Sequence, residues 1–372
     1  MSYILNKIYI DGLFYKGTGI GRYYESLLKG LVQKGMKIYT CVPAEFREDF
    51  EQNFKQYSKN IIPIYVNYKK FSVSGFWRQG KILKKLEKEI SIFHFPHINL
   101  PFYVPKNLIV TIHDLCPLTK FWGRGYFKKK VFEWYLKRAI KKAKKIITIS
   151  ESNKKQIINI YPDCDAKIKV IYEFVDEKFL GTKDYYNKER IIKDDYILFV
   201  GNRKKHKNLF RLILAFSRVK NKFPNLQLVI AGRKDSEMDE IDLLKNKLNL
   251  EGKIIEIISP NDEEIINLYK YAKVFIFPSL YEGFGLPPLE AIACGCPAIT
   301  SNLSVLKEIL GENIACFNPY SVDDITDKII NVLVNERKRK ALLEEGKERL
   351  KLYSKDKIIN QYIKLFYEVT KS

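Results

Sequence analysis

One stretch in the second half of the chain runs from Val274 to Ala291 and reads VFIFPSLYEGFGLPPLEA. Its first four residues are apolar and β-prone, which is typical of a buried strand that ends at Pro278. The proline pair at 287–288 suits the first turn of a helix, where a missing amide hydrogen costs nothing. The stretch therefore predicts a strand, a glycine-containing loop that carries Glu282, and a helix with Glu290 near its positive end.

Short apolar runs of this kind alternate with amphipathic helical patterns along the chain, as expected for parallel sheets with crossover helices. The expected strands of the first half are Lys7–Ile10, Lys37–Val42, Ile61–Val66, Ile92–Phe95, Leu108–Ile112, Lys145–Ile149 and Ile168–Tyr172. Those of the second half are Tyr196–Val200, Leu226–Ala231, Ile254–Ile258, Val274–Phe277, Ala298–Thr300 and Ile314–Phe317. Each half thus predicts a doubly wound α/β domain.

The length of the chain favours two domains. Its 372 residues, 46% of them hydrophobic, exceed the size at which single cores usually split. Residues 176–195 are polar and show little periodicity, so we place the boundary there, with a first domain over 1–178 and a second beginning at 179. In such folds ligands bind beyond the carboxyl ends of the strands, and we expect the site in the cleft that the two domains face.

The net charge of +22 implies an anionic partner, such as nucleic acid, anionic lipid or a phosphorylated ligand. Six cysteines without a CxxC pair are expected to be reduced thiols of a cytosolic protein. The N-terminus lacks the pattern of a signal peptide, and we find no apolar run near 18 residues that would span a membrane.

Candidate ligand-binding residues follow two of the expected strands in the first half of the chain. Gly17, Gly19 and Gly21 precede an amphipathic helix, where glycines let the backbone approach a ligand, although a plain tight turn is equally compatible. The spacing is not the dinucleotide GxGxxG. His113 directly follows Leu108–Ile112, at the edge where ligands bind.

Two further histidines, His94 and His97, lie after another strand, but no additional ligands are close in sequence, so we expect no metal site.

The second domain opens with a strand, a glycine and the cationic loop NRKKHKN, residues 202–208, ahead of a helix. Several cations at a helix N-terminus fit a pyrophosphate group. A solvated basic loop is the alternative.

The order GTGIGRY, TIHDL, FVGNRKKHKNL and PSLYEGFGLPPLEAIACGCPAI resembles the retaining glycosyltransferases of family 4, which have the GT-B fold. The resemblance extends from Asp11 to about Pro319, and Glu282 and Glu290 match the E-x7-E motif of the family. It implies transfer of a hexose from a nucleotide-diphosphate sugar to a polysaccharide, O-antigen, capsule or lipid-linked saccharide, with GDP-mannose favoured over UDP-linked sugars. It also implies a donor-binding domain over 179–354 and a last helix, within 355–372, that packs back on the acceptor-binding domain.

The resemblance further implies roles for single residues. Glu282 would lie against the transferred sugar, and Glu290 would hold the ribose hydroxyls of the nucleotide. The amides of Gly285 and Leu286 would face the diphosphate, and Gly283 and Phe284 belong to the same donor-binding loop. Arg203 and Lys207 would bind the phosphates, and the loop of Gly19 and Gly21 would close over the donor. His113 would approach the sugar and the acceptor. Cations beside the diphosphate stabilise the departing charge, and no DxD motif follows a strand, so we expect neither a metal nor another cofactor.

Two other classes of protein deserve comparison. A glycoside hydrolase also uses two carboxylates, but it has no need of a cationic glycine-containing loop. A nucleic-acid-binding protein would explain the charge, but no known binding module is recognisable, and we expect no nucleic-acid partner.

Residues Tyr126–Lys145 predict a helix with an apolar stripe on one side. On the other side, Trp134 lies among basic residues, namely Lys130, Lys137, Arg138, Lys141 and Lys145. This face is typical of a helix on anionic lipid and predicts a peripheral protein on the cytoplasmic side of the cell membrane. A solvated basic face, with Trp134 against a neighbouring loop, is the alternative.

Overall fold

The computed structural model describes residues 7–17, 19–123, 125–181, 189–234, 238–312 and 314–371. The chain divides into two compact units: unit 1 comprises residues 1–173 and 355–372, and unit 2 comprises residues 174–354. The first boundary lies five residues before the expected 178, whereas the second coincides with the expected 354. Residues 182–188, part of the polar stretch expected to join the domains, lie outside the described residues.

Unit 1 is built on a seven-stranded sheet in the order β3-β2-β1-β4-β5-β6-β7, with neighbouring strands parallel. The strands are β1 Lys7–Ile10, β2 Lys37–Pro43, β3 Ile61–Val66, β4 Ile92–Phe95, β5 Leu108–Ile112, β6 Lys145–Thr148 and β7 Ile168–Val170. The chain adds strands on one side of β1 and then returns to add β4 on the other side. The switch point of the sheet, where ligands of such folds bind, therefore lies between β1 and β4.

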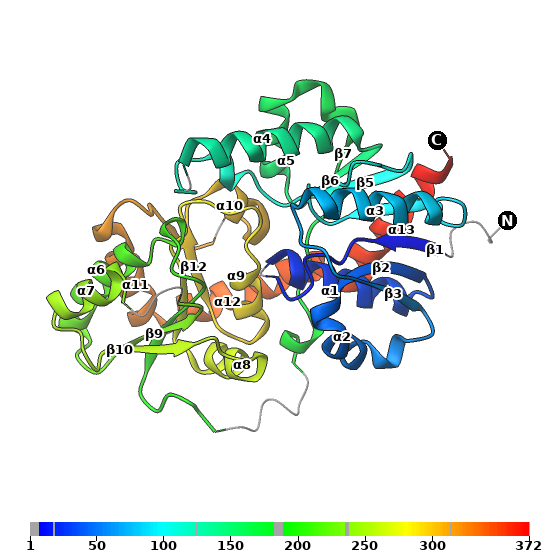
Figure 1. The fold of residues 1–372 in the computed structure, drawn as a ribbon. Helices are drawn as coiled ribbons and strands as arrows, with labels where there is room; N and C mark the ends of the chain where they lie inside the picture. The colour runs from blue at the N-terminus through cyan, green and yellow to red at the C-terminus, as the bar shows by residue number, and fades with distance from the viewer. Residues whose placement is uncertain are drawn as a thin grey trace. The chain divides into compact units, whose positions relative to one another are not determined.

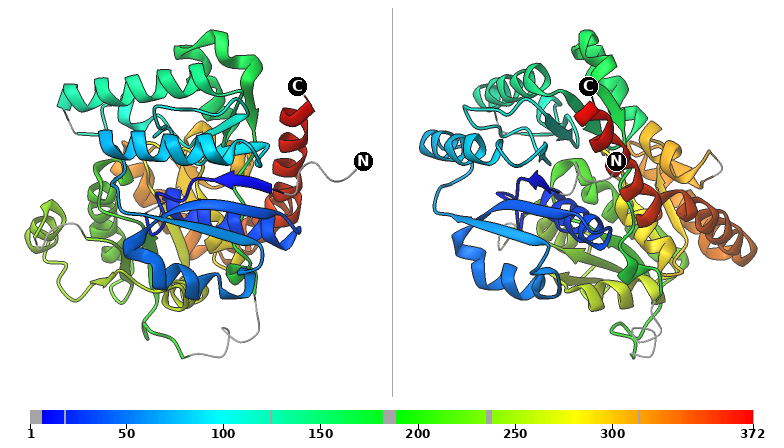
Figure 2. Two further views of the ribbon diagram at one scale, coloured as in Figure 1. Left: turned by 45° about the vertical axis from the view of Figure 1, so that its right-hand side comes forward. Right: turned by 90° about the vertical axis from the view of Figure 1, so that its right-hand side faces the viewer.

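The α-helices of unit 1 connect and cover these strands (Figure 1); they are α1 Gly19–Gln33, α2 Arg47–Asn53, α3 Val73–Leu86, α4 Gly125–Lys142, α5 Glu151–Ile160 and α13 Lys355–Lys371. The C-terminal helix α13 contacts α1 and β4 within this unit (Figure 2). Gly30 on α1 allows this close approach, because an added Cβ would lie 2.4 Å from Cδ1 of Ile359.

Unit 2 contains a six-stranded parallel sheet in the order β10-β9-β8-β11-β12-β13. The strands are β8 Tyr196–Val200, β9 Gln227–Gly232, β10 Ile254–Ile258, β11 Val274–Phe277, β12 Ala298–Ser301 and β13 Cys316–Phe317. The α-helices are α6 Leu209–Lys222, α7 Glu240–Lys247, α8 Asp262–Tyr271, α9 Leu286–Ala293, α10 Ser304–Leu310, α11 Val322–Val334 and α12 Glu336–Leu350. The switch point of this sheet lies between β8 and β11.

All thirteen expected strands occur, with ends that differ from the expected ones by at most two residues. The prediction succeeds because strands covered by helices on both faces read as continuous apolar runs. In β5, for example, all five residues are buried, and so are all four in β11. The fold class expected from the sequence, two doubly wound parallel-sheet domains, is confirmed. Within the described ranges, no helix has both the length and the hydropathy needed to cross a bilayer.

Candidate active site

The topology of unit 2 brings two predicted site residues together. Lys207 lies in the short 3₁₀ helix Lys205–Lys207 that follows β8, and Glu282 lies in the loop that follows β11. Because β8 and β11 are parallel neighbours, both residues lie at the carboxyl edge of the sheet, at its switch point. The two residues are 75 positions apart in sequence, and the pairing of β8 with β11 brings them together.

Lys207 and Glu282 form an ion pair. The Nζ of Lys207 donates to Oε1 of Glu282 at 2.6 Å, and the two side chains are 15% and 13% exposed. The same Nζ lies 5.3 Å from the centroid of the Phe277 ring, at the end of β11. A cation and a carboxylate are thus held side by side where solvent screens them only in part.

The loop that carries Lys207 is fixed by Asn208. This residue has a left-handed backbone, with φ of 57°, and its buried Nδ2 donates to the carbonyl oxygens of Pro278 and Pro319 at 3.0 and 2.8 Å. The backbone N–H of Leu280 also donates to the carbonyl of His206 at 2.7 Å. Our reading of the sequence missed Asn208, although an Asn just before a helix is a known signal for a left-handed turn.

The second glutamate lies one turn inside α9. Gly285 precedes this helix with φ of 122°, and an added Cβ would lie 2.7 Å from Cδ2 of Leu306, so only glycine fits. Glu290 is 6% exposed, and the hydroxyl of Tyr269 lies 3.5 Å from its Oε2. Phe284 is buried, with its ring centroid 5.7 Å from that of Tyr353, and this packing anchors the loop before α9. The backbone of Gly283–Leu286 leads directly into the first turn of the helix.

Arg203 is placed differently from Lys207. Its guanidinium is 6% exposed and pairs with the carboxylates of three residues, namely Asp239 at 3.1 Å, Asp242 at 3.4 Å and Glu256 at 2.6 Å. Lys234 and Lys245 join the same carboxylates. The prediction that Arg203 binds phosphate is not tested by this arrangement, but a guanidinium that neutralises three acids has less charge to offer to a ligand.

The remaining basic residues of the loop have different surroundings. Lys204 and Lys205 are exposed. Burial, with Lys207 nearby, lowers the pKa of His206 to about 4, so this imidazole is neutral at physiological pH. Of the loop's cations, Lys207 is the one that contacts Glu282.

In unit 1, His113 lies at the end of β5. Its Nε2 donates to the carbonyl of Pro96 at 3.0 Å, and its Nδ1 lies 3.5 Å from Oε1 of Glu173, both side chains being 13% exposed. The ring of Tyr23 from α1 meets the imidazole edge-on, with centroids 4.6 Å apart. We did not predict Glu173; its signal is a carboxylate just after the last strand of the first domain.

Two of the three glycines in the first loop, Gly19 and Gly21, have different surroundings. A Cβ added to Gly21 would lie 2.8 Å from the carbonyl oxygen of Phe14, so this glycine serves the packing of the turn. A Cβ on Gly19, at the start of α1, would meet nothing within 4 Å, so this side of the residue faces open space.

His94 and His97 are core residues. The Nε2 of His94 lies 2.8 Å from Oγ1 of Thr111, and that of His97 lies 2.7 Å from Oδ2 of the buried Asp11.

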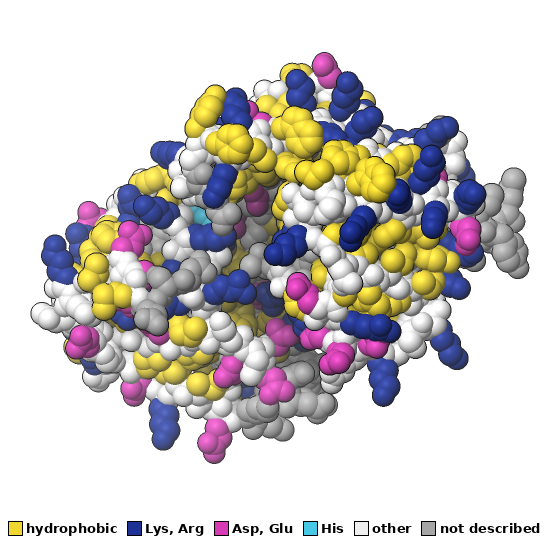
Figure 3. Space-filling model, viewed as in Figure 1, with side chains coloured by type: hydrophobic (Ala, Val, Ile, Leu, Met, Phe, Trp, Pro, Cys, Tyr) yellow, Lys and Arg dark blue, Asp and Glu magenta, His cyan; other side chains and the backbone are white. Residues whose placement is uncertain are grey.

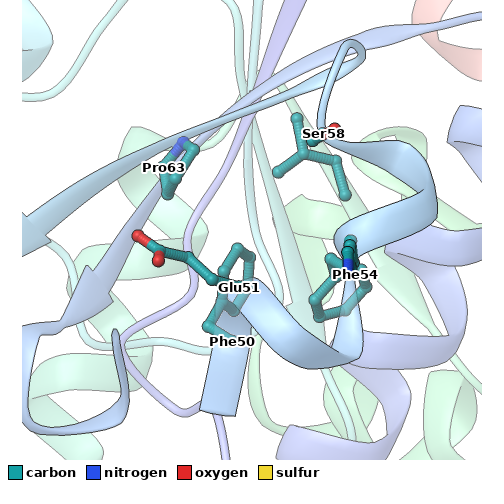
Figure 4. A pocket seen from close by; sticks show the side chains of 7 residues that line it. Phe50, Glu51, Phe54, Ser58 and Pro63 are labelled. Carbon is teal, nitrogen blue, oxygen red and sulfur yellow. The ribbon is translucent and has the colours of Figure 1, made fainter. Parts of the chain in front are cut away.

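One surface hollow lies away from all of these residues. It has a volume of about 380 Å³ and is lined by side chains of α2, of the segment that follows it and of the edge strand β3, among them Phe50, Glu51, Phe54 and Pro63 (Figure 4). None of the predicted site residues contributes to it.

Two family models match the chain. The model described as glycosyltransferase family 4 matches residues 17–179, and the model described as glycosyl transferases group 1 matches residues 183–349. The two matched segments correspond closely to the two parallel-sheet units.

Several characterised proteins are similar in sequence. O-antigen chain mannosyltransferase B of Escherichia coli is 27% identical over 287 residues, which are 74% of this chain and 74% of that protein. O-antigen chain mannosyltransferase RfbU of Salmonella typhimurium is 29% identical over 247 residues, 66% of each chain. The N-acetylgalactosamine-N,N'-diacetylbacillosaminyl-diphospho-undecaprenol 4-alpha-N-acetylgalactosaminyltransferase of Campylobacter jejuni is 26% identical over 295 residues, 76% of this chain and 78% of that one.

Solved structures share the fold. Sucrose-phosphate synthase from Thermosynechococcus elongatus superposes with a TM-score of 0.79 at 16% identity, covering 98% of this chain and 99% of that one. HepE of Anabaena, in complex with UDP and glucose, superposes with a TM-score of 0.75 at 16% identity, covering 97% and 99%. The chain therefore belongs to the group 1 glycosyltransferases of family 4 type, and it is a glycosyltransferase with the GT-B fold.

Proposed function

We propose that this glycosyltransferase moves a hexose, with retention of configuration, from a nucleotide-diphosphate sugar to a saccharide acceptor, and that the donor is GDP-mannose. The observation that carries the proposal is the Lys207–Glu282 ion pair beside the glycine-bounded start of α9, with Glu290 buried one turn further on. Both Escherichia coli mannosyltransferase B and Salmonella RfbU are O-antigen mannosyltransferases by name, which supports mannose.

The chemistry of the pair supports a donor site. Cleavage of the bond between the anomeric carbon and the phosphate leaves negative charge on the diphosphate and a cation-like sugar. Lys207 would stabilise the first, while Glu282 would lie against the second. In the free protein Lys207 also neutralises Glu282, so this carboxylate repels an arriving diphosphate less.

The roles of the other residues follow from the same division. Glu290 would accept hydrogen bonds from the ribose hydroxyls, because a carboxylate accepts two of them well. The backbone of Gly283, Phe284, Gly285 and Leu286 would face the diphosphate at the helix N-terminus. We propose that the reaction needs no metal ion, since Lys207 supplies the cation, and that Arg203 acts chiefly by holding the basic loop.

In unit 1, we propose that Gly19 closes over the donor, beside the packing glycine Gly21, and that His113 approaches the sugar and the acceptor. With no protein nucleophile identified among the described residues, the departing phosphate would itself help to deprotonate the acceptor on the same face of the sugar.

We propose a lipid-linked saccharide as the acceptor and the cytoplasmic face of the cell membrane as the place of work. The Campylobacter jejuni relative, by its name, acts on a diphospho-undecaprenol acceptor, which supports this. UDP is the alternative nucleotide, because HepE binds UDP.

Calorimetric titration of GDP and UDP into the protein tests the assignment. We expect GDP to bind more tightly than UDP, and Glu290→Ala to weaken nucleotide binding by about tenfold or more, since the ribose contacts are lost. Glu282→Ala should leave free nucleotide binding within about threefold and mainly slow transfer. Equal loss of nucleotide affinity in the two variants would contradict the division of roles.

A further inference from the structure

Helix α4 has two apolar stripes. The inner stripe, with Leu136, Ala139 and Ile140, is buried in unit 1. The outer stripe consists of Phe127, Val131 and Trp134, which are 78%, 38% and 53% exposed. Residues spaced by four and three positions share one face of a helix, and this face lies opposite the inner stripe. The core of unit 1 accounts for only one of the two stripes.

A second group of exposed apolar residues surrounds the start of α3. Phe71 and Val73 are 49% and 73% exposed, Trp77 is 59% exposed, and Phe102 in a later loop is 52% exposed. Phe71 has a left-handed backbone, with φ of 61°, which is uncommon for a bulky residue.

Ring contacts join the two groups into one surface. Tyr135 on α4 has its ring 4.9 Å from that of Trp134 and 5.3 Å from that of Phe71. Phe76 on α3 is 5.9 Å from Tyr135 and 5.6 Å from Phe102. Figure 3 shows hydrophobic side chains gathered over α4 and α3 among Lys and Arg side chains. We name the exposed residues of this region the aromatic surface: Phe71, Val73, Trp77, Phe102, Phe127 and Trp134.

The two helices that carry the aromatic surface are strongly basic. Residues 73–86 contain four basic residues and no acidic one, and residues 125–142 contain seven basic residues and one acidic one, Glu133. The Nζ of Lys81 lies 3.5 Å from the centroid of the Trp77 ring. Exposed aromatic rings within a field of lysines match the headgroup region of an anionic bilayer.

Three of the five cations expected around Trp134 make contacts within the protein, although one of them, Arg138, also lies 6.0 Å from the centroid of the Trp134 ring. Arg138 donates to the carbonyls of Leu100 and Pro101 at 2.8 and 2.5 Å, and so holds the loop that presents Phe102. Lys145 lies in β6 and donates to the carbonyl of Ala166, and Lys130 pairs with Glu133. Lys137 and Lys141 remain exposed. Electrostatic attraction of these cations to an anionic surface would therefore be weaker than the sequence suggests. The exposed aromatic rings would have to supply the remaining binding free energy.

We infer that the aromatic surface inserts into the headgroup region of an anionic lipid bilayer, with α3 and α4 lying along it. This inference rests on the proposed function, in which the acceptor is a lipid-linked saccharide. Attachment to the bilayer would bring the enzyme to the membrane that holds this acceptor. Inserted rings make attachment partly independent of charge, so it persists when salt screens the lysines.

Flotation with vesicles tests the surface. We expect the protein to float with equimolar phosphatidylglycerol and phosphatidylcholine, to float less with phosphatidylcholine alone, and to retain a substantial part of its attachment in high salt. Trp77→Ser combined with Trp134→Ser should weaken attachment by about tenfold or more. The matched control, Ile160→Ser combined with Tyr367→Ser, removes two side chains that are 47% and 42% exposed elsewhere on unit 1 and should change little.

Tryptophan fluorescence gives a second readout. The chain has three tryptophans, and two of them, Trp77 and Trp134, lie on the aromatic surface. In Trp122→Phe protein, brominated lipids should quench most of the remaining emission. Absence of quenching, or equal flotation of the tryptophan variant and its control, would overturn the inference in favour of a protein or purely electrostatic partner.

The transferase assay on a detergent-dispersed acceptor separates the two proposals. A wild-type protein that transfers sugar but does not float with anionic vesicles would refute the membrane surface alone. Normal flotation of a wild-type protein that transfers no sugar would refute the proposed function alone.

Discussion

Lys207→Met is the substitution that tests the site most directly. It preserves most of the length of the side chain but removes its charge, and it leaves the carboxylate of Glu282, only 13% exposed, without the cation 2.6 Å away. Loss of a partner from a fully buried pair costs about 3–5 kcal/mol. Because solvent reaches both members of this pair, we expect a smaller loss of unfolding free energy, about 2 kcal/mol.

The same substitution should slow transfer. If Lys207 faces the diphosphate, its removal should lower kcat/KM by about tenfold or more. Lys205→Met is the matched control, since Lys205 is an exposed cation on the same 3₁₀ turn. It should change unfolding free energy by less than about 0.5 kcal/mol and transfer by less than about threefold.

A double-mutant cycle with Glu282→Gln separates the pair from its neighbours. Urea unfolding of the wild type, the two single variants and the double variant should give a coupling energy of about 1–2 kcal/mol. A coupling near zero, together with equal transfer rates for Lys207→Met and Lys205→Met, would refute both the ion pair and its role with the donor.

Two further predictions concern pH and the C-terminal helix. Burial lowers the pKa of His94 to about 3 and that of His206 to about 4. As the pH falls, these two histidines therefore become protonated in the unfolded chain before they do in the folded protein. The free energy of unfolding should fall as the pH drops from about 6.5 towards 4. Urea unfolding should show that the unfolding free energy falls less between pH 7 and pH 5 in His94→Gln than in the wild type. An equal fall in the two proteins would contradict a buried neutral imidazole at position 94. On α1, Gly30→Ala should cost about 1–3 kcal/mol because its Cβ meets Ile359. Ile359→Ala should relieve part of that cost in the double variant, whereas strictly additive losses would argue against the α1–α13 contact.

The architecture could be read from the sequence because its signals are local. Apolar runs such as Val274–Phe277 and Leu108–Ile112 are buried on both faces of a sheet, and this burial is visible as composition without any knowledge of the partner strands. The E-x7-E spacing likewise lies within one strand–loop–helix segment. Glu282 on the loop and Glu290 in α9 therefore lie where the sequence predicted.

Only the tertiary structure decided which cation meets which carboxylate. Lys207 and Arg203 are four residues apart on one loop, yet Lys207 pairs with Glu282 through the neighbouring strand β11, while Arg203 turns to carboxylates on α7 and β10. The order of strands sets these pairings, and no local pattern encodes it. The aromatic surface is likewise assembled by the tertiary structure and not by a local sequence pattern. Helical periodicity in the sequence identifies the two stripes of α4, but the rings that continue the outer stripe come from residues 71–77 and 102, which folding brings alongside.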